Sequence, residues 1–222
     1  MNIFPVTLPP SEHESHDTKA RILEVAERLF MEYGFSATSL RMITGEAKVN
    51  LASVNYHFGS KEALIEAVFN RRLAPLNRER IRQLTELESK VEGPLSVEDI
   101  VNAFVMSALK TEDHQSDISP IFLRLLGRTF TDPASGVRAL LAKQYAEVVS
   151  RFKRALAKAL PHLSEDQLVW RMHFMFGTVA YTNAGMDAIQ LIASSTTAVN
   201  EDQATIFNNV TKFLVAGFKA PQ

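Results

Sequence analysis

The 222-residue sequence has no cysteine, no long apolar run and almost no net charge. Without cysteine there is neither a disulfide framework nor thiolate chemistry. The longest apolar stretches, such as residues 174–181, fall well short of the roughly 20 residues that cross a membrane. The N-terminus lacks a basic region followed by an apolar run, so no signal peptide is expected. We therefore expect a soluble cytoplasmic protein.

The formal net charge of -1 gives no overall attraction to nucleic acid. The charge is uneven, however, because residues 35–82 contain eight basic and four acidic side chains, a local excess of +4. A hydrophobic fraction of 46% is ordinary for a globular chain of this length, which is long enough to bury a core. A basic segment inside a nearly neutral chain suggests that this segment binds an anionic partner.

The apolar residues recur at three- and four-residue steps, and no segment alternates convincingly as a strand. We predict an all-α fold in which a flexible tail at residues 1–16 precedes a helix capped by Asp17 and closed by Gly34. Pro75 falls inside a later helical pattern and is expected to kink or split it. Further helix boundaries are predicted from Thr38 or Ser39, Ser60, Ser96, Ser119-Pro120, Asp132-Pro133, Pro161, Ser164, and Asn200 with Gln203.

The run SLRMITGEAKVNLASVNYHF, residues 39–58, reads as two short helices separated by a tight turn at residues 47–50. Its apolar seam leaves several amide, hydroxyl and aromatic side chains outside, and these types suit base edges and phosphates. Alone, such residues are more often ordinary surface positions. In this order they predict DNA contact. The seam comprises Leu40, Ile43, Ala47, Val49 and Val54, and the residues outside it are Asn50, Leu51, Ser53, Asn55 and Tyr56.

With the upstream ILEVAERLFMEYGF and the downstream GSKEAL, this run resembles the N-terminal domain of TetR-family transcriptional regulators over residues 18–69. The resemblance implies a DNA-binding domain at 17–60, a connecting helix at 61–88 and a ligand-binding and dimerisation domain at 89–219. It also implies that the protein reads a palindromic double-stranded operator as a homodimer. The implied base-reading residues are Ser53 and Asn55, with Asn50 and Leu51 at the start of the reading helix. The implied phosphate contacts are Thr38, Tyr56, His57 and Lys61.

Lys48 occupies the turn position where the family usually has glycine. If the turn needs a left-handed backbone there, lysine costs roughly 1 kcal/mol. Its cation would then be placed to reach DNA.

The segments SPIFLRLLGRTF, VSRFKRALAKALP and WRMHFMFGTVAYT are similar to the PsrA-type branch of the same family. That branch is associated with long-chain fatty acids or their acyl-CoA esters and with fatty-acid metabolism genes. A small hydrophobic effector is therefore expected, with Met106, Met175 and Arg171 also near the site. These residues equally suit a plain core or intrachain ion pairs. The pocket residues expected are Phe104, Phe122, Arg124, Leu125, Arg128, His173, Phe176 and Tyr181.

The helices opened by Ser164 and Asn200 are the predicted dimer interface, and effector binding is expected to shift the helix from Lys61 and weaken operator binding. No metal or cofactor is expected. His13 and His16 fall in the predicted tail, and nothing brings Ser150, His173 and Asp187 together as a catalytic group. Two alternatives stay open: an efflux regulator responding to another hydrophobic compound, and a helical lipid-binding protein without a DNA role.

Overall fold

The computed structural model describes residues 12–108, 122, 125, 126, 129, 135–184 and 202–221. Every regular element in these ranges is helical, which confirms the predicted all-α class. The chain divides into two compact units, Met1–Val68 and Phe69–Gln222. The boundary falls inside the predicted connecting helix, and the predicted functional division at 17–60, 61–88 and 89–219 stays a prediction.

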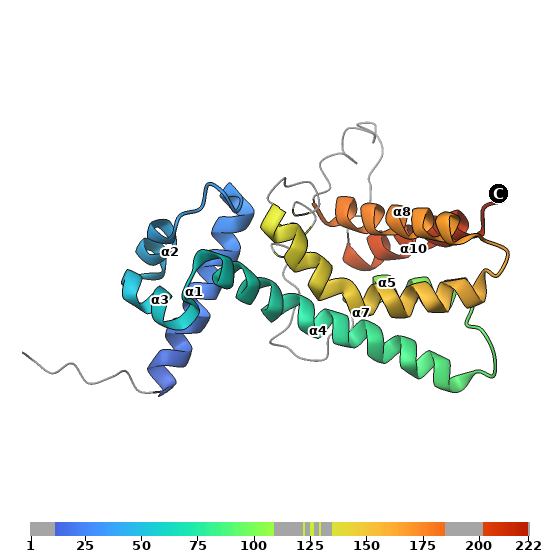
Figure 1. Ribbon diagram of the computed structural model, residues 1–222, viewed down its shortest axis with the longest axis horizontal. Coiled ribbons are helices and arrows are strands. Elements are labelled where there is room, and N and C mark those ends of the chain that lie inside the picture. The colour runs from blue at the N-terminus through green and yellow to red at the C-terminus, as the bar shows by residue number, and fades with distance from the viewer. Residues whose placement is uncertain are drawn as a thin grey trace, which may run out of the picture. The chain divides into compact units, whose positions relative to one another are not determined.

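The first unit contains α1 (Glu12–Tyr33), α2 (Leu40–Ala47), α3 (Leu51–Phe58) and the start of α4 (Lys61–Lys90). The three shorter helices pack on one another, as the blue and cyan ribbons of Figure 1 show. Their shared core is fully buried and includes an aromatic contact between Phe30 and Phe35, whose ring centroids lie 5.3 Å apart. The other core residues are Ile22, Ala26, Leu29, Ile43, Ala47, Val54 and Leu64.

Most predicted helix starts are confirmed by their capping hydrogen bonds. The Ser39 hydroxyl accepts from the Met42 N–H at 3.2 Å, and Ser60 and Ser96 cap in the same way. Ser164 and Gln167 form the predicted reciprocal capping box. These short-range bonds stabilise a helix start by about 1 kcal/mol each, because they satisfy backbone donors that the helix leaves free.

Three predicted boundaries need correction. The first helix begins at Glu12 and not at Asp17, so residues 12–16 are helical and the predicted tail is too long. Pro75 was expected either to kink or to split its helix. The helix α4 is continuous through Pro75, so it is not split there. The last helix begins at Gln203 as predicted, but its cap is Asp202 and not Asn200, and the Asp202 carboxylate accepts from the Thr205 N–H at 2.9 Å. The starts predicted at Ser119-Pro120 and Asp132-Pro133 lie outside the described residues.

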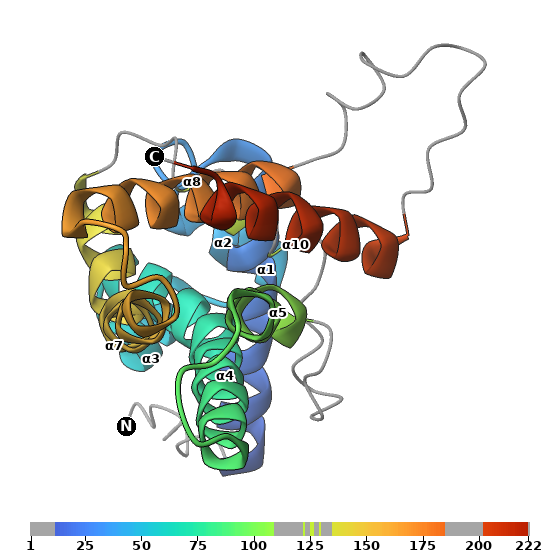
Figure 2. The same cartoon turned by 90° about the vertical axis from the view of Figure 1, so that its right-hand side faces the viewer.

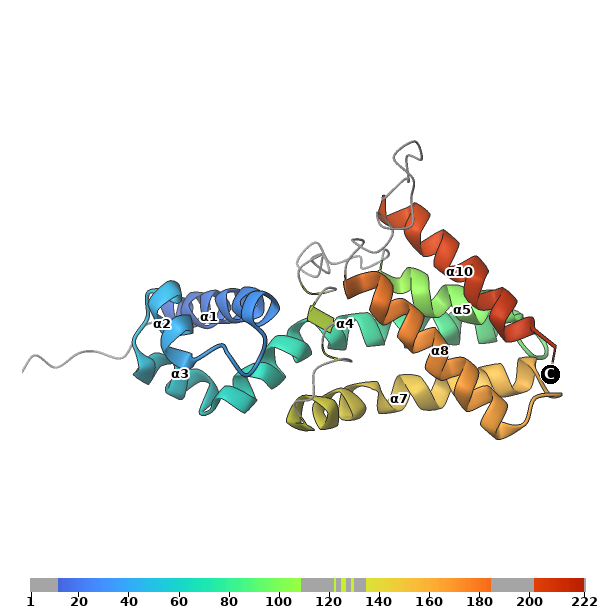
Figure 3. The same cartoon turned by 90° about the horizontal axis from the view of Figure 1, so that it is seen from above.

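The second unit contains the rest of α4, α5 (Val97–Val105), the short 3-10 helix η1 (Met106–Ala108), α7 (Ser135–Ala159), α8 (Glu165–Ala184) and α10 (Gln203–Lys219). Figures 2 and 3 show α5 between α4 and α10. Six of its nine residues are buried, while Asp99 and Asn102 are exposed, so α5 is covered on most of its surface and keeps one polar face. In Figure 1, α7 runs back beside α4 and leads into α8, and α8 contacts α10.

Candidate nucleic-acid interface

The turn between α2 and α3 depends on an unusual backbone conformation at Lys48. This residue has φ 53° and ψ 46°, and it is the one non-glycine residue with positive φ in the described ranges. Its backbone N–H donates to the Thr44 carbonyl and so caps α2. The left-handed conformation expected for this turn is therefore present. Lysine tolerates it only at a cost, and its side chain is exposed.

Lys48→Gly should make the folded protein more stable by about 1 kcal/mol, because glycine has no Cβ to strain the left-handed conformation. If the Lys48 cation contacts DNA, the same change should weaken operator binding and reduce its dependence on salt by about one charge per subunit. Denaturant unfolding and DNA titration at several salt concentrations measure the two effects. Lys48→Asn is the matched control, since asparagine also tolerates this conformation. Lower stability of the glycine variant would contradict the strain argument.

Asn50 begins α3 and serves as its cap. Its side-chain oxygen accepts from the Ser53 N–H at 2.8 Å and from the Ser53 hydroxyl at 3.0 Å. This pair satisfies a free backbone donor at the helix start and fixes how α3 leaves the turn. The sequence predicted that Asn50 and Ser53 both contact DNA. In the structure, the hydrogen bonds of Asn50 cap α3 without any contribution from DNA, and the bond to Ser53 orients the Ser53 hydroxyl.

The rest of α3 separates clearly into a buried and an exposed face. Val54 is fully buried against α2, while Leu51, Asn55 and Tyr56 are exposed. Tyr56 is 78% exposed, an extreme value for an aromatic side chain. An eight-residue helix that buries one valine and exposes leucine, amide and phenol groups has a surface suited to another molecule.

His57 lies beside Tyr56, with the ring centroids 5.1 Å apart in an edge-to-face arrangement. It is half-buried, and this burial, helped by the nearby Lys19 cation, lowers the pKa of its imidazole below the usual 6.5. At neutral pH the ring is therefore uncharged. It offers an N–H donor to a phosphate without a full charge.

Acidification should destabilise the protein through His57. Because its pKa is lowered in the folded state, the unfolded chain binds the proton more readily in the window just below pH 6.5. The stability that neutral His57 contributes is fully present above that pH and is lost as the pH falls toward the folded pKa. Urea unfolding at about pH 7.5 and about pH 5.5 measures the loss, which should be smaller in His57→Gln. An equal loss in both proteins would contradict this assignment.

Thr38 was expected to contact phosphate, and its position corrects that expectation. Its side chain is fully buried, and its hydroxyl lies 3.0 Å from the Leu29 carbonyl oxygen and 2.8 Å from that of Gly34. Its backbone N–H also donates to Gly34. Thr38 therefore anchors the loop before α2 to the end of α1, and it has no group left to offer a phosphate.

Lys61 is the first residue of α4 and is half-buried. The Ser60 hydroxyl beside it accepts from the Ala63 N–H at 3.1 Å. The first turn of a helix carries a partial positive charge, so a lysine here adds to a local field that favours phosphate.

Two arginines of α1 bind α2 and stabilise the helix-turn-helix, and neither was predicted from the sequence. Arg21 donates from Nε to the Ala47 carbonyl at 2.9 Å and so closes the C-terminal end of α2. Arg28 forms an ion pair with Glu46 on α2 and a longer one with Glu32. Because the contacts from Arg21 and Arg28 to α2 join residues far apart in sequence, their spacing along the chain gives no local signal.

The residues expected to bind an effector fall into separate groups. Phe104, Phe122 and Leu125 are buried, and Phe176 packs edge-to-face on Phe104 with centroids 5.2 Å apart. His173 and Tyr181, by contrast, are exposed on α8, so neither lines an interior pocket. Arg124 and Arg128 lie outside the described residues.

Arg171, which was expected near the effector site, forms structural hydrogen bonds. Its guanidinium donates to the carbonyls of Gly217, Phe218 and Ala220, the last at 2.9 Å. These carbonyls lie at the C-terminal end of α10, where backbone acceptors have no partner within the helix. Arg171 therefore fastens α8 to the end of α10.

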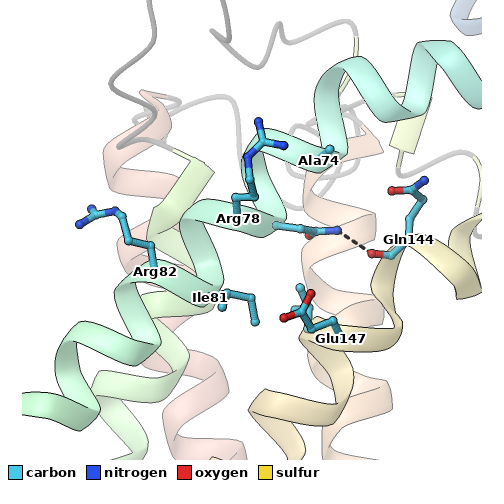
Figure 4. Close-up of a pocket in the computed structure, with 8 residues that line it drawn as sticks. Ala74, Arg78, Ile81, Arg82, Gln144 and Glu147 are labelled. Carbon is cyan, nitrogen blue, oxygen red and sulfur yellow. Dashed lines mark hydrogen bonds between the residues drawn. The ribbon is translucent and has the colours of Figure 1, made fainter.

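A groove of about 420 Å³ lies between α4 and α7 (Figure 4), away from the predicted pocket residues. Asn77 is one of the residues that line it, and its side-chain amide donates to the Gln144 carbonyl at 2.9 Å, which is the dashed line in Figure 4. The groove is open and its walls mix apolar and charged groups. They are Ala74, Asn77, Arg78, Ile81, Arg82, Gln144, Glu147 and Val148.

Neither a metal site nor a membrane-spanning helix is found in the described part of the chain. No group of three or more histidine, aspartate or glutamate side chains in it is arranged to hold a metal ion. None of its helices combines the length and apolarity needed to cross a membrane.

Sequence comparison identifies the family. Residues 22–68 match the family described as bacterial regulatory proteins, tetR family, and residues 102–217 match the tetracyclin repressor-like C-terminal domain. The chain belongs to the TetR family. Its helix-turn-helix is thus a DNA-binding domain of a transcriptional regulator, and members of this family typically act on operators as dimers with small-molecule effectors.

Curated TetR-family relatives include the transcriptional repressor NemR of Escherichia coli K12, 27% identical over 66% of this chain and 70% of NemR. The regulator AcrR of Shigella flexneri is 32% identical over 47% of each chain. Among solved structures, a putative fatty acid metabolism regulator of Clostridium perfringens aligns with a TM-score of 0.61 at 18% identity, over 90% of this chain and all of that one. The SmeT–triclosan complex aligns with a TM-score of 0.59 at 19% identity, over 89% and 91% of the two chains. At these identities the structures support the fold alone.

Proposed function

We propose that this TetR-family protein is a repressor that binds a palindromic operator as a homodimer and is released by a small hydrophobic effector. The observation that carries the proposal is the exposed face of α3 on an otherwise well-packed motif. Ser53 and Asn55, with Leu51, are proposed to meet base edges. Lys48, Tyr56, His57 and Lys61 are proposed to contact the phosphate backbone.

The dimer part of the proposal rests on exposed aromatic side chains. Trp170, Phe174 and Tyr181 on α8 and Phe213 on α10 are each at least 60% exposed. We call these four the aromatic surface. Water-exposed aromatics in this number on two neighbouring helices favour burial against a partner, and a second copy places two reading helices about a two-fold axis. The predicted interface helices, from Ser164 and Asn200, are the same two.

The effector part of the proposal concerns which hydrophobic compound binds in the second unit. The apolar interior around Phe104 suits a hydrophobic molecule, and the PsrA-type likeness favours a long-chain fatty acid or acyl-CoA with control of fatty-acid metabolism genes. One structural neighbour is a putative fatty acid metabolism regulator, and another was solved with triclosan. The second supports the rival proposal that the effector is another hydrophobic compound, as in a regulator of efflux.

One titration tests the regulator proposal against a lipid-binding protein without a DNA role. The full-length protein is mixed with a labelled fragment from upstream of its own gene, and binding is followed at increasing salt. We expect saturable binding that weakens steeply with salt, as phosphate contacts require. Mass spectrometry of the natively purified protein then identifies a co-purifying effector. Absence of site-selective DNA binding would contradict the proposal.

A further inference from the structure

Arg80 is a buried cation in the interior of the second unit. It lies on α4 and is only 3% exposed. Arginine is almost never buried this fully without a negatively charged partner, because removing a charge from water costs several kcal/mol.

The partners that Arg80 does have are neutral. Its Nε–H donates to the Phe104 carbonyl at 3.0 Å, and Nη1 donates to the Asn77 side-chain oxygen at 3.2 Å. The guanidinium carbon also lies 4.0 Å from the centroid of the Phe104 ring. These groups offer partial charges only, the largest at the C-terminal end of α5. No carboxylate in the described ranges forms an ion pair with Arg80.

Neighbouring arginines show that carboxylates are available on the same helices. The exposed Arg82, two residues further along α4, holds both Glu79 and Glu86. Arg151 on α7 pairs with Glu88. Arg82 and Arg151, which reach solvent, are thus paired with carboxylates and the buried Arg80 is not, which is the reverse of what stability alone favours.

The side chains around Arg80 indicate what kind of molecule could bind its guanidinium group. The ring of Phe104 contacts Phe152 and Phe176, with centroids 5.4 and 5.2 Å away, and Tyr145 lies 5.8 Å from the guanidinium. Tyr145 is itself buried. Two of the five N–H donors of Arg80 are used, which leaves three for an anion.

We propose that Arg80 is the anion-binding residue of the effector site, and that the effector carries one carboxylate or phosphate head on an apolar body. The proposal rests on the effector-responsive function proposed above. The head group meets the free guanidinium N–H groups and the Tyr145 hydroxyl, while the body packs on the aromatic rings. Such an anion supplies the missing charge, so binding is strongest for molecules that carry it.

The test compares probes that differ only in the head group. Decanoate, decyl phosphate and uncharged 1-decanol are titrated into the full-length protein by calorimetry. Wild type should bind decanoate about 30-fold more tightly than 1-decanol, the scale of a charge-assisted hydrogen bond in a dry site. The decyl phosphate titration shows which of the two anionic heads the site prefers.

Arg80→Gln keeps a donor for the Phe104 carbonyl but lacks the charge, and it should bring the acid-to-alcohol ratio close to one. Arg78→Met removes an exposed arginine of the same helix and should leave the ratio unchanged. If Arg80→Gln does not fold, Arg80→Lys carries the test, because losing the planar fork should weaken decanoate about 5-fold and leave 1-decanol unaffected. A wild-type ratio near one, or a ratio that survives Arg80→Gln, overturns the proposal.

Failure of this site is distinguishable from failure of the proposed function. Operator release is measured in parallel with the same probes. Decanoate binding that depends on Arg80 but does not release DNA supports the site and contradicts the repressor proposal. Release of DNA by neutral compounds without any preference for decanoate overturns the site and leaves the repressor proposal standing.

Discussion

Phe174→Glu should convert the protein into a monomer and weaken operator binding about 100-fold or more. Phe174 is 60% exposed on α8 and belongs to the aromatic surface. A carboxylate there would be buried without a partner in any dimer formed through α8 and α10, which costs several kcal/mol at each of two symmetric positions. A monomer then binds one half-site and loses the gain from joining two reading helices, which is about 100- to 10,000-fold.

Sedimentation and operator titration of the same samples measure both effects. Val91→Glu is the matched control, because Val91 is also an exposed apolar residue of the second unit but lies outside α8 and α10. The control should remain dimeric and bind DNA normally. A dimeric Phe174→Glu protein, or a monomeric wild type with full operator affinity, would contradict the proposed interface.

Asn55→Ala should weaken selective operator binding while leaving the fold intact. Asn55 is exposed on α3, and no side-chain hydrogen bond of Asn55 is found in the part of the chain that the structure describes. A base contact by an amide contributes about 1–3 kcal/mol, and a dimer makes it twice. The expected loss is therefore roughly 30-fold to 20,000-fold for the operator, with non-specific binding unchanged.

Asn50→Ala provides a control of the same chemistry on the same helix. Because Asn50 caps α3, its loss should lower the free energy of unfolding by about 1 kcal/mol, whereas Asn55→Ala should not change it. Competition with unrelated DNA separates selective from general binding. Equal losses on operator and unrelated DNA in Asn55→Ala would assign Asn55 to the phosphate backbone.

The sequence predicted the local parts of this fold well. Capping residues such as Ser39 and Ser164 act within three residues of their targets, so their roles are visible in a short segment. The helix α3 has the predicted bounds for the same reason. The start of α1 was placed too late, because a polar, proline-containing segment gives little sign that its last residues are helical.

The site was less predictable where its role depends on burial. Thr38 looks like a surface threonine beside a helix start, yet it is buried by the end of α1. His173 and Tyr181 lie in an apolar sequence that reads as core, and only the arrangement of α8 shows them exposed. Arg80 sits in the charged run NRERIRQ and reads as a surface cation, although the fold buries it.

The central claim is that α3 of a dimeric protein reads a two-fold symmetric DNA site. Selection of binding sequences from a random DNA library by the purified full-length protein tests it most directly, with Asn55→Ala selected in parallel. We predict that wild type enriches one palindrome with two half-sites, and that the variant loses preference at one symmetric pair of positions. Enrichment of no sequence, or of a single unrepeated half-site, would contradict the claim.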